Sequence, residues 1–518
     1  MFVDSVEQLM APETQVPEHF DVLIIGAGLS GIDAAHHLNK LCPKKSYVIL
    51  EQRERIGGTW DLFRYPGIRS DSDMLTMSYS FRPWTRAKTI SPGEDIREYI
   101  TAAAREEGID RNIRFHHQIK RASWSSQDAQ WNVEAVRTTS DGRDEQVMLT
   151  CNFLFSCAGY YRYSGGYLPE FPNMARFQGK IVHPQAWPED LDYAGKRVLV
   201  IGSGATAFTL VPAMAKTAGH VTMLQRSPGY VISMPEKDRI ANLLRRIMPS
   251  KWAYKLSRWK NIGYVAAMYQ LSQRHPELIK KFLLTKVREE LGAEFDVDTH
   301  FTPRYKPWQQ RVCLVPDADM FEAIKTGRAG VITDEIDTFT EKGIRLKSGH
   351  KLEADIIVTA TGLVMQTFGG AELIVDAQRV DASKVLAYKG VMMSGVPNFA
   401  SVFGYINASW TLKADLICHY VCRLLNFMEK KGIRQVTPKA RGETAVAGFV
   451  EKFTPGYINR ALASWPKQGA KAPWRVYQNY FRDTLALKWN RIDDGALEFS
   501  NPASVPAQRP VELAEAAR

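Results

Sequence analysis

Two glycine-rich turns in one chain could each hold the pyrophosphate of a dinucleotide. The first is Gly26-Ala27-Gly28-Leu29-Ser30-Gly31 and the second is Gly202-Ser203-Gly204-Ala205-Thr206-Ala207. In such turns glycine permits a tight bend between a strand and a helix, and the helix N-terminus favours the charge of the phosphates. A single turn of this kind is weak evidence, because similar turns occur where nothing binds. Two of them predict two bound dinucleotides and a redox reaction between them.

The residue that ends the second strand of each unit indicates which dinucleotide binds. Glu51 follows the apolar strand 47–50, where a carboxylate can accept hydrogen bonds from both ribose hydroxyls and would repel a 2′-phosphate. The first site therefore fits FAD or NAD. The strand 220–224 runs instead into Gln225, Arg226 and Ser227, with no acid. A guanidinium pairs well with a 2′-phosphate, so the second site is predicted to take NADPH. The alternative is that Arg226 is a solvated charge at a strand end.

The positions of the cysteines argue against a disulfide as the electron acceptor of the flavin. The chain has six cysteines, scattered without the spacing of a zinc site or a disulfide framework. Flavoproteins that bind two dinucleotides and reduce disulfides carry a close cysteine pair soon after the first unit. No cysteine lies between Gly57 and Cys151. We therefore expect the flavin to deliver its electrons to another acceptor.

The elements that must position these turns predict a large α/β protein. With 518 residues the chain is too long for a single core. We expect two Rossmann-like dinucleotide-binding domains, one for FAD and one for NADP, with a helical insertion in the NADP domain. The predicted FAD-binding domain comprises residues 1–159 and 388–518, and the predicted NADP-binding domain comprises residues 160–234 and 302–387. The helical insertion covers residues 235–301.

The net charge of +11 invites a nucleic-acid or membrane interpretation. Much of it lies between Arg239 and Arg288, where aromatic residues are interleaved with the basic ones. This segment could be a basic amphipathic surface that touches anionic lipid, or a helical insertion with solvated basic faces and an aromatic inner stripe. We favour the second interpretation and expect no nucleic-acid partner. No apolar run approaches the roughly 20 residues of a membrane span, and residues 1–19 lack the features of a signal peptide. We expect a cytoplasmic enzyme, with peripheral membrane contact left open.

Further motifs resemble the type I Baeyer–Villiger monooxygenases over nearly the whole chain. The resemblance is greatest for the subgroup that includes the ethionamide-activating monooxygenases. It is carried by the following stretches: Gly57-Gly58-Thr59-Trp60; Arg64-Tyr65-Pro66-Gly67 with Arg69 and Asp71; the fingerprint Phe177-x-Gly179-x-x-x-His183-x-x-x-Trp187-Pro188; Pro303-Arg304-Tyr305-x-Pro307-Trp308; Ala360-Thr361-Gly362; and Gly404-Tyr405-x-Asn407-x-Ser409-Trp410. It implies that FAD is contacted by Gly58, Thr59, Trp60, Asp61 and Asp71, in addition to the first turn and Glu51.

The resemblance also implies an activity. NADPH would reduce the flavin, and a flavin peroxide formed with O2 would insert one oxygen atom beside a ketone carbonyl to give an ester or a lactone. Thioether sulfoxidation would be a companion activity. Arg311 matches the family's active-site arginine, which would stabilise the peroxide anion and the developing oxyanion. Asp71 would position that arginine, and His183 would belong to the hinge that couples nicotinamide binding to closure.

Two alternatives stay open at this point. One is an enzyme that oxygenates only nitrogen or sulfur, like the flavin-containing and N-hydroxylating monooxygenases. The other is a non-catalytic binder of flavin and NADPH that senses redox state. The chain also departs from the pattern at Gln310, where relatives often have a lysine that grips the 2′-phosphate. The expected preference for NADPH therefore depends mainly on Arg226.

Overall fold

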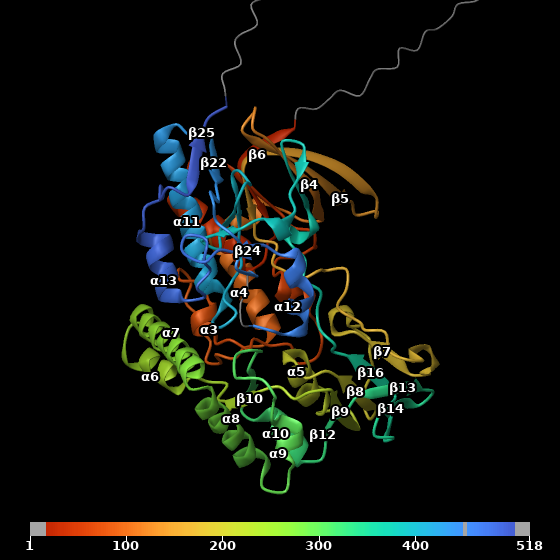
Figure 1. The fold of residues 1–518 in the computed structure, drawn as a ribbon. Coiled ribbons are helices and arrows are strands. Elements are labelled where there is room, and N and C mark those ends of the chain that lie inside the picture. The colour runs from red at the N-terminus through yellow and green to blue at the C-terminus, as the bar shows by residue number, and fades with distance from the viewer. Residues whose placement is uncertain (1–16, 449–452, 503–518) are drawn as a thin grey trace, which may run out of the picture.

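The computed structural model describes residues 17–448 and 453–502. Two α/β regions lie one above the other, and the upper one combines elements from the beginning and the end of the chain (Figure 1). Most of the segment that we compared with signal peptides falls outside the described residues. Within the described ranges, no helix has the length and apolar character needed to cross a bilayer. All six cysteines are buried and free.

The upper region contains a parallel Rossmann core extended by an antiparallel meander. Its strands are ordered β18-β17-β4-β5-β6-β1-β2-β3, and β21 also pairs with β6. The pairs β1-β2, β1-β6, β2-β3 and β21-β6 are parallel, whereas β4, β5 and β6 run antiparallel. The strands span Glu18–Ile25 (β1), Tyr47–Leu50 (β2), Ile113–Arg114 (β3), His117–Ser125 (β4), Gln130–Thr138 (β5), Asp144–Ser156 (β6), Glu372–Val375 (β17), Gln378–Arg379 (β18) and Phe399–Ser401 (β21). Because β21 joins this sheet, the chain returns to its first domain after the second.

Helices cover this sheet and form the largest core. The fully buried apolar side chains of α1 face those of α11, which comes about 380 residues later in the chain. Their contact fixes the first glycine turn against the C-terminal part of the protein. The helices of this region are α1 (Leu29–Leu41), α2 (Thr59–Leu62), α3 (Met74–Met77), α4 (Gly93–Glu106), α11 (Trp410–Lys431), α12 (Gly456–Ala461) and α13 (Tyr480–Thr484), with a π-helical turn η7 at Leu485–Trp489.

The lower region is a second Rossmann unit. Its parallel sheet has the order β12-β9-β8-β16-β7. The strands are β7 (Lys180–Val182), β8 (Arg197–Ile201), β9 (His220–Gln225), β12 (Ala329–Thr333) and β16 (Ile356–Thr359), and the helices beside them are α5 (Ala205–Met214) and α10 (Asp319–Lys325). Strand β16 lies between β8 and β7, so the Ala-Thr-Gly turn that follows β16 is brought next to the second glycine turn and to the fingerprint segment that contains β7. The predicted fold class is confirmed.

Smaller sheets complete the two regions. The antiparallel ribbon β13-β14-β15 lies beside the lower sheet, β10 pairs with β11 on either side of the insertion, and further short pairs of strands join C-terminal segments. These strands are β10 (Val231–Met234) with β11 (Cys313–Pro316), β13 (Ile336–Thr340), β14 (Gly343–Leu346), β15 (Lys351–Glu353), β19 (Ala387–Tyr388) with β20 (Met392–Met393), β22 (Gln435–Pro438) with β25 (Leu497–Ser500), and β23 (Ala447–Gly448) with β24 (Lys467–Gln468).

The helical insertion lies between β10 and β11 and consists of α6 (Arg239–Ile247), α7 (Ser250–Arg274), α8 (Pro276–Leu291) and α9 (Val297–Phe301). Helix α7 docks on the upper region through the buried Arg258, whose Nη1 donates to the carbonyls of Leu75, Thr76 and Ser78 at 2.8–3.1 Å. The expectation of an aromatic inner stripe is wrong. Tyr254 faces inward, but more than half of the surface of Trp252, Trp259 and Tyr264 is exposed, because the face toward the core is occupied by small residues and Arg258.

Candidate functional site

Both glycine turns open into one cavity of about 890 Å³ between the two regions. Most of the residues predicted to act lie on its wall. They are Gly26, Gly28, Glu51, Gly58, Thr59, Trp60, Asp71, Gly202, Gly204, Ala205, Thr206, Arg226, Ser227 and Arg311. Three predicted residues do not: Gly31, Asp61 and His183. The structure therefore brings two turns, a ribose-type carboxylate and an arginine–aspartate pair into one space.

The two turns have the geometry of phosphate cradles. Helices α1 and α5 begin after Gly28 and Gly204, and neither residue supplies a side-chain cap, so the first amide N–H groups of both helices have no side-chain acceptor at the cap. Gly31 acts behind the cradle, since a Cβ atom there would stand 1.9 Å from the Gly26 carbonyl oxygen. At Gly202 a Cβ atom would stand 2.3 Å from the carbonyl oxygen of Ala360. The missing side chain at Gly31 therefore lets α1 approach the first turn, and the missing side chain at Gly202 lets the Ala-Thr-Gly turn approach the second.

The carboxylate of Glu51, directly after β2, is held in a fixed orientation in which it can accept hydrogen bonds from ribose hydroxyls. Its Oε2 accepts from the Ala27 amide at 2.8 Å and its Oε1 from the Arg53 amide at 2.9 Å. Burial raises the pKa of the Glu51 carboxyl, and the two amide donors oppose that shift. Each oxygen keeps a further lone pair for a hydroxyl. The residues present thus fit the adenosine half of FAD.

Arg226 stands exposed on the cavity wall at the end of β9. No ion pair joins its guanidinium to a carboxylate among the described residues. Glu335 also lines this end of the cavity, but its carboxylate is held by Lys347 at 2.5 Å. The Ser203 hydroxyl donates to the Ser227 carbonyl at 2.9 Å and closes the turn beside it. This end of the cavity can accept a 2′-phosphate.

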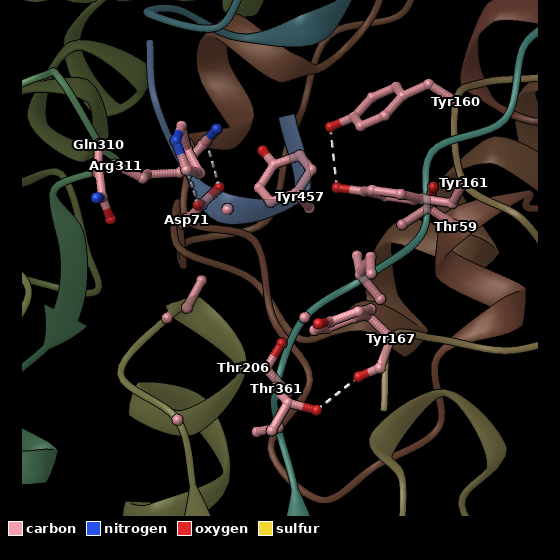
Figure 2. A pocket seen from close by; sticks show the side chains of 18 of the residues that line it. Thr59, Asp71, Tyr160, Tyr161, Tyr167, Thr206, Gln310, Arg311, Thr361 and Tyr457 are labelled. Atoms are coloured by element: carbon pink, nitrogen blue, oxygen red, sulfur yellow. Dashed lines mark hydrogen bonds and ion pairs between the residues drawn. The ribbon is translucent and has the colours of Figure 1, made fainter. Parts of the chain in front are cut away.

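Arg311 and Asp71 form a bidentate ion pair inside the cavity (Figure 2). Arg311 Nη2 donates to Asp71 Oδ1 at 2.7 Å, and Nε contacts the other carboxylate oxygen. Burial opposes the charge on Arg311, but the Asp71 carboxylate outweighs it and raises the pKa of the guanidinium above its ordinary value. Arg311 precedes β11 in the lower region, and Asp71 lies in the loop before α3 in the upper one. The pair therefore connects the two regions with a permanent cation.

Tyrosines surround this pair, and the sequence did not identify them as site residues. In Figure 2 the ring of Tyr457 lies between the ion pair and the neighbouring tyrosines Tyr160 and Tyr161, whose hydroxyls are 2.9 Å apart. Burial raises the pKa of all three phenols, so each keeps its proton. The three tyrosines that directly follow the predicted domain boundary at residue 159 were a usable signal: Tyr160, Tyr161 and Tyr163. Nothing in the pattern near Tyr457 marked it.

Arg460, also on α12, closes another side of the cavity. Its guanidinium carbon lies 3.6 Å from the ring centroid of Tyr167, and Nη2 donates to the Leu363 carbonyl at 3.2 Å. The hydroxyl of Thr361, in the Ala-Thr-Gly turn, donates to the backbone carbonyl of Tyr167 at 2.6 Å. Helix α12, which the sequence assigned only to the second part of the FAD-binding domain, is thus part of the cavity wall.

His183 lies behind the wall at the contact between the fingerprint and the Ala-Thr-Gly turn. Its Nδ1 accepts from the Gln185 amide at 3.1 Å, and Nε2 lies 3.3 Å from the Gly362 carbonyl oxygen. Burial lowers the pKa of the imidazole, which indicates a neutral ring that donates from Nε2. This placement agrees with a positioning role and gives His183 no access to a reacting atom.

Asp61 also points away from the cavity. Its carboxylate is buried and faces the guanidinium groups of Arg53, Arg55 and Arg64 at 2.7–3.3 Å. Asp61 therefore fixes the loop that carries Gly58 and Thr59, and its carboxylate is not available to FAD.

Comparison with known proteins decides the family. The sequence profile described as "Flavin-binding monooxygenase-like" matches residues 21–430. The chain belongs to this family of flavin-binding monooxygenases.

The chain is 51% identical over 484 residues to the FAD-containing monooxygenase EthA of Mycolicibacterium smegmatis, which covers 93% of this chain and 97% of EthA. Two solved structures share the fold. An oxidised steroid monooxygenase bound to NADP matches with a TM-score of 0.73 at 22% identity over 93% of this chain and all of that one. Cyclohexanone monooxygenase from Rhodococcus bound to NADP+ matches with a TM-score of 0.72 at 19% identity over 94% of this chain and all of that one. The resemblance that the motifs indicated is confirmed, and the protein is a flavin monooxygenase.

Proposed function

We propose that this monooxygenase binds FAD in the upper region and NADPH in the lower one, and inserts one oxygen atom from O2 beside a ketone carbonyl. The product is an ester or a lactone, and thioether sulfoxidation accompanies it. The observation that carries the proposal is the Arg311–Asp71 pair, a fixed cation in the cavity between the two glycine turns. The names of the relatives support a monooxygenase of this kind.

Each group in the cavity has a definite task in this reaction. When bound, FAD reduced by NADPH supplies an activated oxygen atom derived from O2. The amide N–H groups at the starts of α1 and α5 bind the pyrophosphates, and Glu51 binds the adenosine ribose of FAD. Arg226 binds the 2′-phosphate of NADPH.

Arg311 stabilises the negative charge that oxygen carries before and during its addition to the carbonyl. A cation that is already in place costs no reorganisation when this charge appears. Asp71 orients the guanidinium through both of its oxygens. The protonated phenols of Tyr160 and Tyr457 can donate hydrogen bonds and exclude water from the part of the cavity beside the ion pair.

A second candidate function is oxygenation of nitrogen or sulfur alone. It is favoured by the same phenols, because a protonated neighbour suits transfer of oxygen to a soft nucleophile. Against it stands the permanent charge of Arg311, which favours anionic oxygen.

Product analysis separates the two candidates. Purified FAD-loaded protein is incubated with NADPH, O2 and, in separate reactions, a linear ketone, a cyclic ketone, a thioether and an amine. We expect each ketone to be converted to an ester or a lactone. The mass of this product should exceed that of the ketone by about 16 units, the mass of one oxygen atom. Sulfoxide or hydroxylamine without any ester would support the second candidate and overturn the first.

A further inference from the structure

The outer surface of the helical insertion is apolar to an unusual degree. On α6 the side chains of Ile240, Leu243 and Ile247 recur on one side of the helix and are 55–66% exposed. This stripe faces away from the buried Ala241, so it is not the core side of the helix. Single exposed apolar residues need no explanation, but a contiguous group of them does.

The apolar stripe continues on α7 and beyond it. Trp252, Leu256 and Trp259, spaced by four and three residues, are 50–59% exposed. The ring of Trp259 lies 6.5 Å from that of Phe481, after which Leu485 and Trp489 are again exposed, the latter by 75%. In Figure 1, α6 and α7 lie side by side at the edge of the molecule, directly below α13. We call the exposed apolar side chains of α6, α7 and residues 481–489 the outer face.

Basic residues border the outer face, and no acid interrupts it on the insertion. Between Arg239 and Arg274 the chain contains no Asp or Glu. Three of its cations are used internally, since Arg245 and Arg258 bind backbone carbonyls and Lys260 pairs with Asp238 at 2.5 Å. Others remain exposed on α6 and α7: Arg239, Arg246, Lys251 and Lys255. The Nζ of Lys255 lies 5.3 Å from the ring centroid of Trp252, so charge and apolar surface adjoin directly.

We propose that the outer face binds the surface of an anionic phospholipid membrane. Exposed tryptophan and aliphatic side chains would enter the boundary between headgroups and acyl chains, and the bordering lysines and arginines would contact anionic headgroups. A second copy of this chain is a poorer occupant. A two-fold contact would place this acid-free basic border against itself, and like charges would repel.

Vesicle sedimentation tests the proposal on the FAD-loaded protein. The probes are vesicles of phosphatidylcholine alone and vesicles with about one third phosphatidylglycerol, each at low and high NaCl. We expect the protein to pellet with the anionic vesicles at low salt and much less at high salt, because screening weakens contact with headgroups. Equal binding to both kinds of vesicle, or binding to neither, would overturn the proposal.

Variants separate the outer face from the protein's general charge. In one variant Lys251 and Lys255 are replaced by Gln, and its matched control carries Lys430→Gln and Lys431→Gln, which are exposed at the end of α11. Each lysine near an anionic surface contributes about fivefold in binding, so the first variant should bind roughly 25-fold more weakly and the control close to normally. Equal losses in both variants would contradict a defined face.

The apolar contribution is tested separately by Leu243→Ser combined with Trp252→Ser. The matched control is Met148→Ser, an exposed apolar position on β6. We expect vesicle binding to fall at least tenfold only in the first variant, while visible flavin absorbance and NADPH oxidation stay unchanged. Sedimentation velocity without lipid measures whether the parent protein and the variant form dimers. A dimer that dissociates in this variant, with no vesicle binding by the parent protein, would assign the outer face to a second copy.

Discussion

Asp71 is the residue on which the orientation of Arg311 depends. Both carboxylate oxygens contact the guanidinium, and the aspartate comes from the opposite region of the molecule. For Asp71→Asn we expect ester formation to fall about 10- to 100-fold, since a hydrogen bond between charged groups contributes about 1.5–3 kcal/mol. FAD content should stay normal. Rates of ester formation are compared with those of Asp190→Asn, an exposed position, and equal rates in the two variants would show that Asp71 does not act on Arg311.

Arg226 carries the predicted preference for NADPH. Its guanidinium is exposed on the cavity wall, and Gln310 supplies no second cation nearby. Arg226→Ala should raise KM for NADPH by roughly 10- to 100-fold and leave KM for NADH nearly unchanged. Arg328, at the opposite end of the same sheet, provides the control Arg328→Ala. If both coenzymes respond equally to Arg226→Ala, the phosphate contact is refuted.

Single residues were predictable where a motif required a particular side chain. Glu51, Arg226, Arg311 and Asp71 followed from strand ends or from the resemblance, and all four lie on the cavity wall. Asp61 shows the limit of this reasoning. The carboxylate of Asp61 faces three arginines and not the cavity. The sequence cannot distinguish these two orientations, because tertiary packing sets the direction of the side chain.

At the scale of elements, the first turn depends on how closely α1 approaches β1. Gly31→Ala would place a methyl group 1.9 Å from the Gly26 carbonyl oxygen and push the helix away from the phosphate site. We expect purified protein with little bound FAD and lower stability, measured by visible absorbance and thermal unfolding. Gly263→Ala on α7 is the control, because nothing lies within 4 Å of its Cβ position. Alanine in that exposed helix should be neutral or stabilising by up to about 1 kcal/mol. Normal FAD content in Gly31→Ala would contradict the packing argument.

Elements with strong periodicity were predicted well. The strands expected at 47–50 and 220–224 are β2 and β9. The orientation of the insertion was not predictable. Its aromatic residues have helical spacing, but the buried Arg258 with its three carbonyl acceptors turns the opposite face of α7 toward the core. Sequence spacing alone cannot show which stripe of such a helix is covered.

At the scale of the whole molecule, stability should depend on pH through a half-buried histidine on α11. Burial and the neighbouring Lys488 lower the pKa of His419 to about 4. Its ordinary value is roughly 6.5, so below that pH the unfolded chain binds a proton that the folded protein does not. The stability contribution is therefore complete above pH 6.5 and is lost as the pH falls toward 4. At pH 5 the loss should be on the order of 1 kcal/mol, because solvent screens a half-buried group.

The variant His419→Gln should lose less stability than the parent protein between pH 7 and pH 5, measured by urea unfolding at each pH. His350→Gln, in the exposed turn before β15, serves as the control and should follow the parent protein. Parallel pH profiles for the parent and His419→Gln would contradict the assignment.

The arrangement of the two regions determines which segments of the chain meet at the cavity. The sequence predicted two dinucleotide units, but not that α12 from the C-terminal part would close the cavity with Tyr457 and Arg460. The packing of α1 against α11 and of α7 on α3 likewise joins segments far apart in the chain, and no local pattern encodes such contacts.

The central claim is that Arg311 stabilises anionic oxygen during insertion. The most direct measurement compares Arg311→Ala with the parent protein, following flavin reduction by NADPH and ester yield from a ketone in the same preparation. Loss of one such donor costs about 100- to 1,000-fold in rate. We predict that Arg311→Ala binds FAD and is still reduced by NADPH, while ester formation falls by at least about 100-fold. Ester formation close to that of the parent protein would contradict the account.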